Sequence, residues 1–233
     1  MLAEEAMKYG NRYWSEAVGT FALVFTGCGA IVVNDNFAGA LGHLGICIVF
    51  GLIVMAVIYA FGSVSGAHIN PAVTIAFVVA HRFEARSVLP YIACQLAGAV
   101  AAGLLLRALF GDHPTFGATL PSGSVLQSFA LEIVLSFLLM LVILNVATGA
   151  KETGIMAGVA IGGMVALEAL VGGPVSGASM NPARSLGPAI ASGELADLWI
   201  YLIAPVIGMA LACPMSRMIQ GADGRSASDA GDA

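Results

Sequence analysis

Two stretches of the chain repeat one polar pattern at one spacing. Residues 65–74 read SGAHINPAVT and residues 176–185 read SGASMNPARS, so Ser, Gly, Ala, Asn, Pro and Ala recur 111 positions apart. The asparagine of each copy, Asn70 or Asn181, carries an amide group that donates hydrogen bonds. These residue types suit hydrogen bonding to small neutral molecules, and they require no bond-breaking chemistry.

The residues that precede each asparagine are small or polar and favour an irregular, extended backbone. Carbonyl groups on such a backbone are available to accept hydrogen bonds from a passing solute. The positions expected to supply this backbone are Gly66, Ala67, His68, Gly177 and Ser179.

Each Asn-Pro pair also marks the start of a helix. Asn is a favoured N-cap residue, and Pro is favoured at the first helical position. Only about ten apolar or small residues follow each pair, whereas about twenty are needed to cross a bilayer. The motifs Asn70-Pro71-Ala72 and Asn181-Pro182-Ala183 therefore predict two short helices that begin inside a membrane.

The composition is that of an integral membrane protein. Of the 233 residues, 59% are hydrophobic and 10% are charged, whereas about a quarter of the residues in a soluble domain are charged. No run of Lys or Arg suggests nucleic-acid binding, and no spacing of Cys or His suggests a metal or another cofactor. Six apolar segments are long enough to span a bilayer, at residues 14–33, 42–61, 88–110, 125–147, 155–171 and 198–219.

The repeat extends beyond the two motifs. Glu16 in the first span is matched by Glu132 in the fourth span, 116 residues later. Each half, at about residues 12–110 and 125–219, then holds three spans and one half-helix. Because three is an odd number, the two halves must be inserted in opposite orientations, as an inverted repeat.

The orientation follows from the basic residues. With six spans both ends of the chain share one side of the membrane, and seven Lys or Arg residues lie on that side against two on the other. The positive-inside rule then places the termini in the cytoplasm. We expect a single transmembrane channel domain at residues 1–220 in a plasma membrane, namely a bacterial inner membrane, and a disordered tail at residues 221–233.

Opposite insertion brings the two half-helices in from opposite faces, so their N-termini should meet near the midplane. The positive ends of two helix dipoles at one point disfavour cations and protons and leave neutral molecules free to pass. Irregular backbone at that depth survives only inside protein or beside a water-filled cavity. The sequence thus predicts selection by hydrogen bonding, size and charge.

Four of the charged side chains in the predicted membrane segments need an explanation. Arg184 follows the second motif, and a cation at that depth is expected to face water or a partner. Glu16 and Glu132 are expected to be buried acceptors for the backbone donors of the two irregular segments. Glu168 has no counterpart in the first half, and it is either a pore-mouth charge or a lateral contact. The histidines at segment ends, which we expect to be solvated, are His43, His81 and His113.

Together these residues resemble the aquaporin, or major intrinsic protein, family. The resemblance rests on the paired Asn-Pro-Ala motifs, the arginine two places after the second proline and the glutamates of spans one and four, and it covers residues 14–219. It implies an all-α membrane protein with an aquaporin-like right-handed bundle of six transmembrane helices and two re-entrant half-helices. It also implies one pore per subunit and a homotetramer in the lipid bilayer.

The resemblance further implies a selectivity filter of four residues. Strict water channels typically have His at the filter position on the fifth span, where this chain has Ala, so the filter should be wider and less polar. The four positions are Phe50 on the second span, Ala169 on the fifth span, Ala178 before the second motif, and Arg184 after it.

Within the family the chain looks most like the nodulin-like branch. This resemblance rests on the sequence of residues 176–189 and on the pair Tyr201-Leu202, where water channels usually have Phe-Trp. Glycerol facilitators typically have Asp after the filter arginine, where this chain has Ser185. The branch conducts water, glycerol and undissociated metalloid hydroxides such as arsenous and boric acid, so these solutes are the expected partners.

Two other functions fit parts of this pattern. A secondary transporter on the same inverted repeat would use Glu16, Glu132 or Glu168 as a proton carrier and would accumulate its solute uphill. A membrane-embedded hydrolase would need Ser65 and His68 to act together, but the sequence offers them no activating partner and no HExxH zinc motif. The pattern favours a passive channel and no enzyme, with a water-selective aquaporin as the alternative to a solute-permeable pore.

Overall fold

The computed structural model describes residues 2–146 and 155–220, and in that part of the chain the regular structure is helical. Six of the described helices are long and apolar enough to cross a membrane. They are α1 (Leu2–Asn36), α2 (Gly42–Ser65), α4 (Val88–Phe110), α5 (Val125–Val146), α7 (Ala157–Ser176) and α9 (Leu198–Gln220). The predicted disordered tail at residues 221–233 lies outside the described residues.

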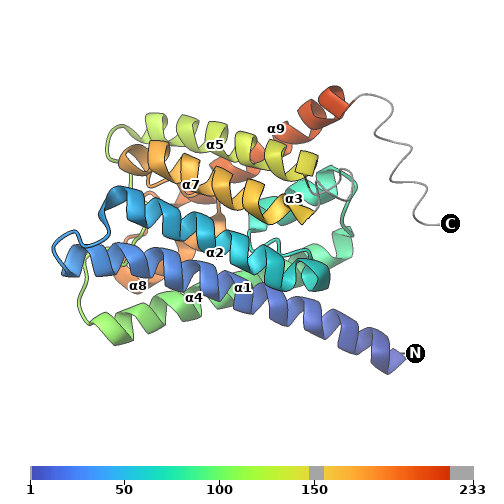
Figure 1. Cartoon of the computed structure of the whole chain (residues 1–233), viewed down its shortest axis with the longest axis horizontal. Helices are drawn as coiled ribbons and strands as arrows, with labels where there is room; N and C mark the ends of the chain where they lie inside the picture. The colour runs from blue at the N-terminus through green and yellow to red at the C-terminus, as the bar shows by residue number, and fades with distance from the viewer. Residues whose placement is uncertain (1, 147–154, 221–233) are drawn as a thin grey trace.

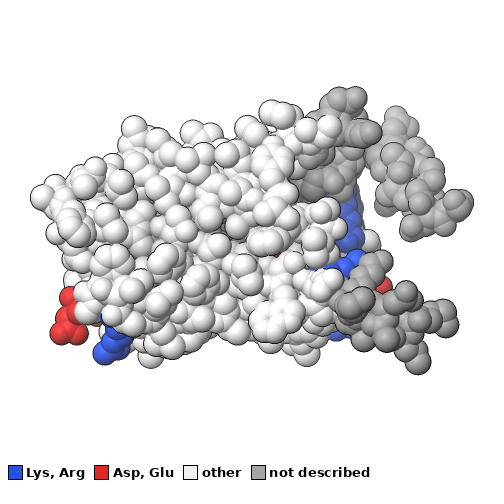
Figure 2. Space-filling model, turned by 60° about the horizontal axis from the view of Figure 1, so that its bottom comes forward, with Lys and Arg blue, Asp and Glu red and all other residues white. Residues whose placement is uncertain are grey.

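Two shorter helices, α3 (Pro71–Val79) and α8 (Pro182–Ser192), follow the two Asn-Pro pairs, and a short 3-10 turn, η1 (Ala85–Ser87), precedes α4. Figure 1 shows α3 and α8 toward opposite ends of the bundle, and the N-terminal end of α1 at the same end of the molecule as the C-terminal end of α9. In the face shown by Figure 2, charged side chains gather near the two ends and the middle is free of them. This distribution is that of a molecule whose middle lies in hydrocarbon.

The second and fifth spans are longer than the sequence predicts. They end at Ser65 and Ser176, past the predicted ends at residues 61 and 171. Each helix stops where a glycine adopts a left-handed conformation, with φ of +86° at Gly66 and +83° at Gly177. Only a residue without a Cβ atom adopts this conformation readily, which explains the glycine of each motif.

The fifth span continues through Pro174 because a distant side chain compensates for the missing N–H group. Pro174 cannot donate a hydrogen bond to the carbonyl of Leu170 four residues earlier. The ring Nε2 of His43, at the start of α2, instead lies 2.9 Å from the Leu170 oxygen. The contact therefore joins α2 to α7 where the helix would otherwise break.

The helices approach closely at glycines. A Cβ atom at Gly51 of α2 would lie 2.5 Å from the carbonyl oxygen of Gly162 of α7, and a Cβ atom at Gly162 would lie 2.5 Å from the oxygen of Gly51. In the same way, a Cβ atom at Gly98 of α4 or at Gly208 of α9 would overlap backbone atoms of α1 or α5. Small residues let these backbones touch, which is how helices associate in lipid.

Candidate pore and selectivity filter

Each asparagine caps the short helix that follows it. Asn70 has an extended backbone, and its side-chain oxygen accepts a hydrogen bond from the backbone N–H of Ala72 at 2.9 Å. Asn181 does the same for α8, accepting from Ala183 at 3.0 Å and from Arg184 at 3.3 Å. Pro71 and Pro182 occupy the first helical positions, so each cap holds a helix N-terminus at a fixed point.

The two motifs are hydrogen-bonded to each other. The amide nitrogen of Asn70 donates to the carbonyl oxygen of Met180 at 2.8 Å, and the amide nitrogen of Asn181 donates to the carbonyl oxygen of Ile69 at 2.9 Å. These crossed bonds bring the N-termini of α3 and α8 together. Each amide nitrogen carries a second N–H group, which is the donor left for a solute.

A buried carboxylate fixes each irregular segment. Glu16 accepts from the hydroxyl of Ser65 at 2.7 Å and from the backbone N–H groups of His68 and Ile69 at 2.9 and 2.7 Å. The Nε2 group of Gln95 adds a further bond to Glu16 at 2.8 Å. Glu16 thus collects donors from the backbone before α3 and from two other helices.

Glu132 plays the same part in the second half. It accepts from the hydroxyl of Ser176 at 2.7 Å and from the backbone N–H groups of Ser179 and Met180, both at 2.8 Å. Because the backbone N–H groups of Ser179 and Met180 bind Glu132, the carbonyl groups of this irregular segment face away from the carboxylate. Sequence reasoning expected this role for both glutamates.

The irregular segments contain residues in a conformation that side chains disfavour. Ala67 and Ile69 have φ of +46° and +43°, and Ala178 and Met180 have φ of +43° and +53°. A left-handed backbone is uncommon outside glycine and costs free energy, so it persists only where the surroundings impose it. The bonds to Glu16 and Glu132 are that constraint.

Two tyrosines also hold the irregular segments in place, a role that the sequence did not predict for them. The hydroxyl of Tyr91 donates to the carbonyl of Ser65 at 2.9 Å, and the hydroxyl of Tyr201 donates to the carbonyl of Ser176 at 2.7 Å. They therefore bind the last residue of α2 and of α7. The signal was present, because the tyrosines lie 110 positions apart, close to the spacing of the motifs.

His68 lies behind the first irregular segment and not free in a cavity. Its ring is buried among Phe77, Phe83 and Tyr91, and its Nδ1 lies 3.2 Å from the hydroxyl of Thr74. The hydroxyl of Ser65 is directed to Glu16 and not to this ring. The two residues are therefore not arranged as a nucleophile and its base.

Arg184 is held inside the protein beside the second motif. Its side chain is 4% exposed, and its Nη1 donates to the carbonyl oxygen of Gly117 at 2.7 Å and to the sulfur of Cys28 at 3.4 Å. Its guanidinium carbon lies 4.9 Å from the centroid of the Phe50 ring. A cation over an aromatic face is attracted by the ring, so Phe50 and Arg184 form one unit.

The structure places the other two expected filter residues on neighbouring surfaces. Ala169 is buried on the face of α7 that also carries Gly172. A Cβ atom at Gly172 would lie 3.3 Å from that of Ala178, so this face of α7 adjoins the segment before the second motif. Arg184 and Phe50 are in contact, and Ala178 adjoins α7 one turn beyond Ala169.

The loop between α4 and α5, residues 111–124, supplies contacts that sequence reasoning missed. Gly117 provides the carbonyl that binds Arg184, and the hydroxyl of Thr119 lies 2.8 Å from that of Ser185. The backbone N–H of Ser122 donates to the carbonyl of Val175 at 3.0 Å. The loop therefore binds Arg184 and both sides of the second motif.

Glu168 is neither a pore-mouth charge nor a lateral contact. Its side chain is 3% exposed, on the buried face of α7. Neither carboxyl oxygen has a hydrogen-bond partner among the described residues.

Two of the three histidines at segment ends are exposed, as the sequence predicts, but His113 is not. The residue is only 7% exposed, and its ring is packed in the loop beside Phe116. The expectation that His113 is solvated is wrong because the loop folds over the bundle. Among the described residues no group of three or more His, Cys, Asp or Glu side chains is placed to hold a metal ion.

Comparisons with known proteins agree with this geometry. The family model described as major intrinsic protein matches residues 5–215. The chain is 49% identical to Nodulin-26 of Glycine max over 195 residues, covering 83% of this chain and 72% of that protein. It is also 49% identical to Aquaporin NIP1-1 of Oryza sativa subsp. japonica over 195 residues, covering 83% of this chain and 69% of that protein.

A solved structure shares the fold. The X-ray structure of the aquaglyceroporin from Plasmodium falciparum is similar with a TM-score of 0.82 and 26% sequence identity. The similarity covers 91% of this chain and 97% of that one.

Proposed function

The chain belongs to the major intrinsic protein family, whose members are membrane channels and not enzymes, and from this premise we propose which solutes it passes and how. The proposed function is passive permeation of water and of small uncharged solutes such as glycerol and undissociated metalloid hydroxides, including arsenous acid. Protons and ions are excluded.

The observation that carries the proposal is the crossing of Asn70 and Asn181. Each side-chain oxygen caps one half-helix and each amide binds the other motif, so two amide donors are fixed where two helix N-termini meet. The positive ends of both helix dipoles act at this point. A neutral solute exchanges hydrogen bonds here without electrostatic repulsion, whereas a cation or a proton is repelled by the positive helix ends.

The proposed selectivity filter comprises Phe50, Ala169, Ala178 and Arg184. Arg184 offers charge-assisted donors to a hydroxyl group, while the aromatic ring and the two methyl groups offer an apolar wall. Polyols and metalloid hydroxides present hydroxyls on one side and little hydration elsewhere, which matches such a wall. Alanine in place of a bulkier residue at position 169 supports a pore wider than that of a water-only channel.

Further features of the proposal concern assembly and location. The chain is a multi-pass membrane protein, and we infer an inverted repeat of its two halves, a homotetramer and a plasma membrane location with both termini in the cytoplasm. The equivalent contacts of Glu16 and Glu132 support the repeat. The relatives reported above are plant proteins, so they lend no support to the bacterial inner membrane expected from the sequence.

Replacing Asn181 by Asp tests the role of the crossing. The variant removes the donor to Ile69 and adds a negative charge between the two helix N-termini, so water and glycerol flux should fall sharply. Asn145→Asp is the control, because Asn145 lies near the end of α5, where its side chain donates to Leu141 and accepts from Gln220, and it contacts neither motif. Unaltered flux in Asn181→Asp would place this residue away from the pore.

A further inference from the structure

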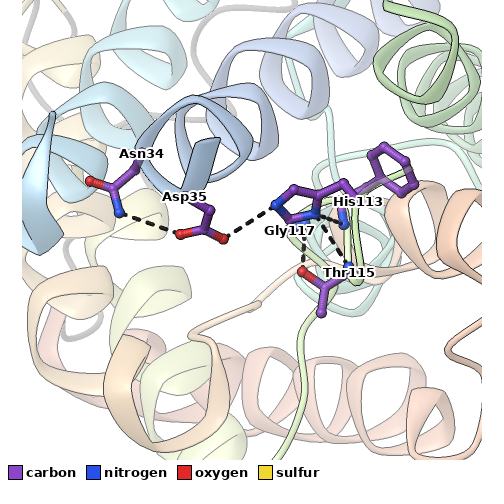
Figure 3. A network of polar contacts seen from close by, with 6 residues as sticks. Asn34, Asp35, His113, Thr115 and Gly117 are labelled. Atoms are coloured by element: carbon purple, nitrogen blue, oxygen red, sulfur yellow. Dashed lines mark hydrogen bonds and ion pairs between the residues drawn. The ribbon is translucent and has the colours of Figure 1, made fainter. Parts of the chain in front are cut away.

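The loop between α4 and α5 contains a small polar network next to the filter, drawn in Figure 3. The ring Nδ1 of His113 accepts hydrogen bonds from the backbone N–H groups of Phe116 at 2.9 Å and of Thr115 at 3.3 Å. The other ring nitrogen, Nε2, lies 3.3 Å from the Oδ2 atom of Asp35, near the end of α1. The ring thus links α1 to the backbone of the loop.

The same turn of the loop carries the carbonyl that binds the filter arginine. Phe116 and Gly117 have φ of +49° and +75°, and the backbone N–H of Ala118 closes the turn by bonding to the carbonyl of Thr115 at 2.9 Å. The Gly117 carbonyl then accepts from Arg184 at 2.7 Å. A non-glycine residue at positive φ needs outside support, and the bonds to the His113 ring provide it.

We propose that His113 is a positioning residue of the selectivity filter. By accepting two backbone amides on Nδ1 it holds the turn in which the Gly117 carbonyl faces Arg184, and it thereby sets how far the guanidinium reaches toward the Phe50 ring. The inference rests on the proposed channel function, because it assigns the filter to Arg184 and Phe50. It adds a residue on a loop to a filter otherwise built from helices and the second motif.

The tautomer of the ring follows from its two contacts with the turn. A ring nitrogen accepts a hydrogen bond only when it carries no proton, so the two backbone amides assign the proton to Nε2, which faces Asp35.

The ring is enclosed beside a surface pocket. The His113 side chain is 2% exposed, and His113 lines a pocket of about 420 Å³ together with Arg107 of α4 and Asp112 of the loop. Asp35 is the carboxylate in direct contact with the ring.

Two variants separate the contacts of the ring. His113→Asn keeps an acceptor oxygen near the position of Nδ1, so it preserves the bonds to the turn. His113→Gln places its polar group near the position of Nε2, so it keeps a group facing Asp35 and loses the acceptor for the turn. The two substitutions are similar in size and polarity, and each serves as the control for the other.

The experiment measures glycerol and water permeability of proteoliposomes at neutral pH. The glycerol-to-water ratio should stay at the wild-type value in His113→Asn and fall several-fold in His113→Gln. An unchanged ratio in His113→Gln, or an equal fall in both variants, would overturn the proposal.

Hydrogen–deuterium exchange of residues 111–118 gives a readout that needs no solute flux. The amides of Thr115 and Phe116 should be protected in the wild type and in His113→Asn and exposed in His113→Gln. Protection in His113→Gln equal to that of the wild type would refute the role of the ring. Absence of glycerol flux from wild-type vesicles would instead contradict the proposed solute range, and it would leave the exchange result to decide on His113.

Discussion

The guanidinium carbon of Arg184 lies over the ring of Phe50, 4.9 Å from the ring centroid. Phe50 comes from α2 and Arg184 from the first turn of α8, so the contact joins the two halves of the chain. The Phe50 ring also packs on Gly27 of α1, where a Cβ atom would overlap the ring. Gly27 precedes Cys28, whose sulfur accepts a hydrogen bond from Arg184, so one turn of α1 positions both Phe50 and Arg184.

Gly27→Ala should displace Phe50 toward Arg184 and narrow the filter. Glycerol permeability should fall several-fold and water permeability less, with a loss of about 1–3 kcal/mol in stability from overpacking. Gly29→Ala is the matched control, since a Cβ there would meet only a methyl group of Leu106, at 3.3 Å. Equal glycerol flux in the two variants would show that Phe50 does not limit solute passage.

Ala169→His should convert the pore toward water selectivity. The imidazole would add both bulk and a donor on the buried face of α7, so glycerol and arsenous acid flux should be lost while water flux is retained. Ala169→Ser is the control, because it adds a polar atom with little volume. Solute flux that survives in Ala169→His would place this residue outside the filter.

Arg184→Ala should weaken the exclusion of cations. A unit charge 4 Å from a permeating cation opposes it by about 4 kcal/mol at an effective dielectric constant of about 20, so proton leak should rise by about tenfold or more. A pH-sensitive dye inside the vesicles measures the leak after a proton gradient is imposed. An unchanged leak would argue against the electrostatic role of Arg184.

Glu168→Gln should leave transport intact. Its carboxyl group has no partner among the described residues, so the amide replaces a group that makes no bond there, and the thermal midpoint of unfolding should be unchanged or higher. A proton-coupled transporter that used Glu168 as its carrier would instead lose uphill accumulation in this variant. Measuring glycerol flux with and without a proton gradient distinguishes the two mechanisms.

Gly162→Ala should destabilise the bundle where α2 and α7 touch. Its Cβ would lie 2.5 Å from the carbonyl oxygen of Gly51, so the helices must separate, at a cost of about 1–3 kcal/mol. Gly163→Ala is the control one residue away, because nothing lies within 4 Å of a Cβ there. Thermal unfolding in detergent should show a lower midpoint for the first variant alone.

The sequence predicted the parts of the structure that depend on local signals. Six spans follow from apolar length, and α3 and α8 follow from the preference of Asn and Pro for helix starts. The roles expected for Glu16 and Glu132 came from their equivalent positions combined with the cost of burying a charge. These features need no knowledge of which helices are neighbours.

The remaining features depend on contacts between distant segments. Local rules end the fifth span before Pro174, and only the contact of His43 with Leu170 explains its continuation. The loop that holds Arg184 has no periodic pattern, so neither the Gly117 carbonyl nor the burial of His113 was visible in the sequence. The contacts of Phe50 and Ala169 with their neighbours likewise depend on how the helices pack. A single sequence contains no local pattern that predicts such contacts.

The most direct test of the account is stopped-flow light scattering on proteoliposomes, first with an impermeant osmolyte, then with glycerol and then with arsenous acid at neutral pH. The account predicts fast shrinkage in the osmolyte and re-swelling in both solutes that exceeds that of empty vesicles, increases linearly with solute gradient and ignores a proton gradient. Fast shrinkage without re-swelling in either solute would contradict it and would identify a water-selective pore.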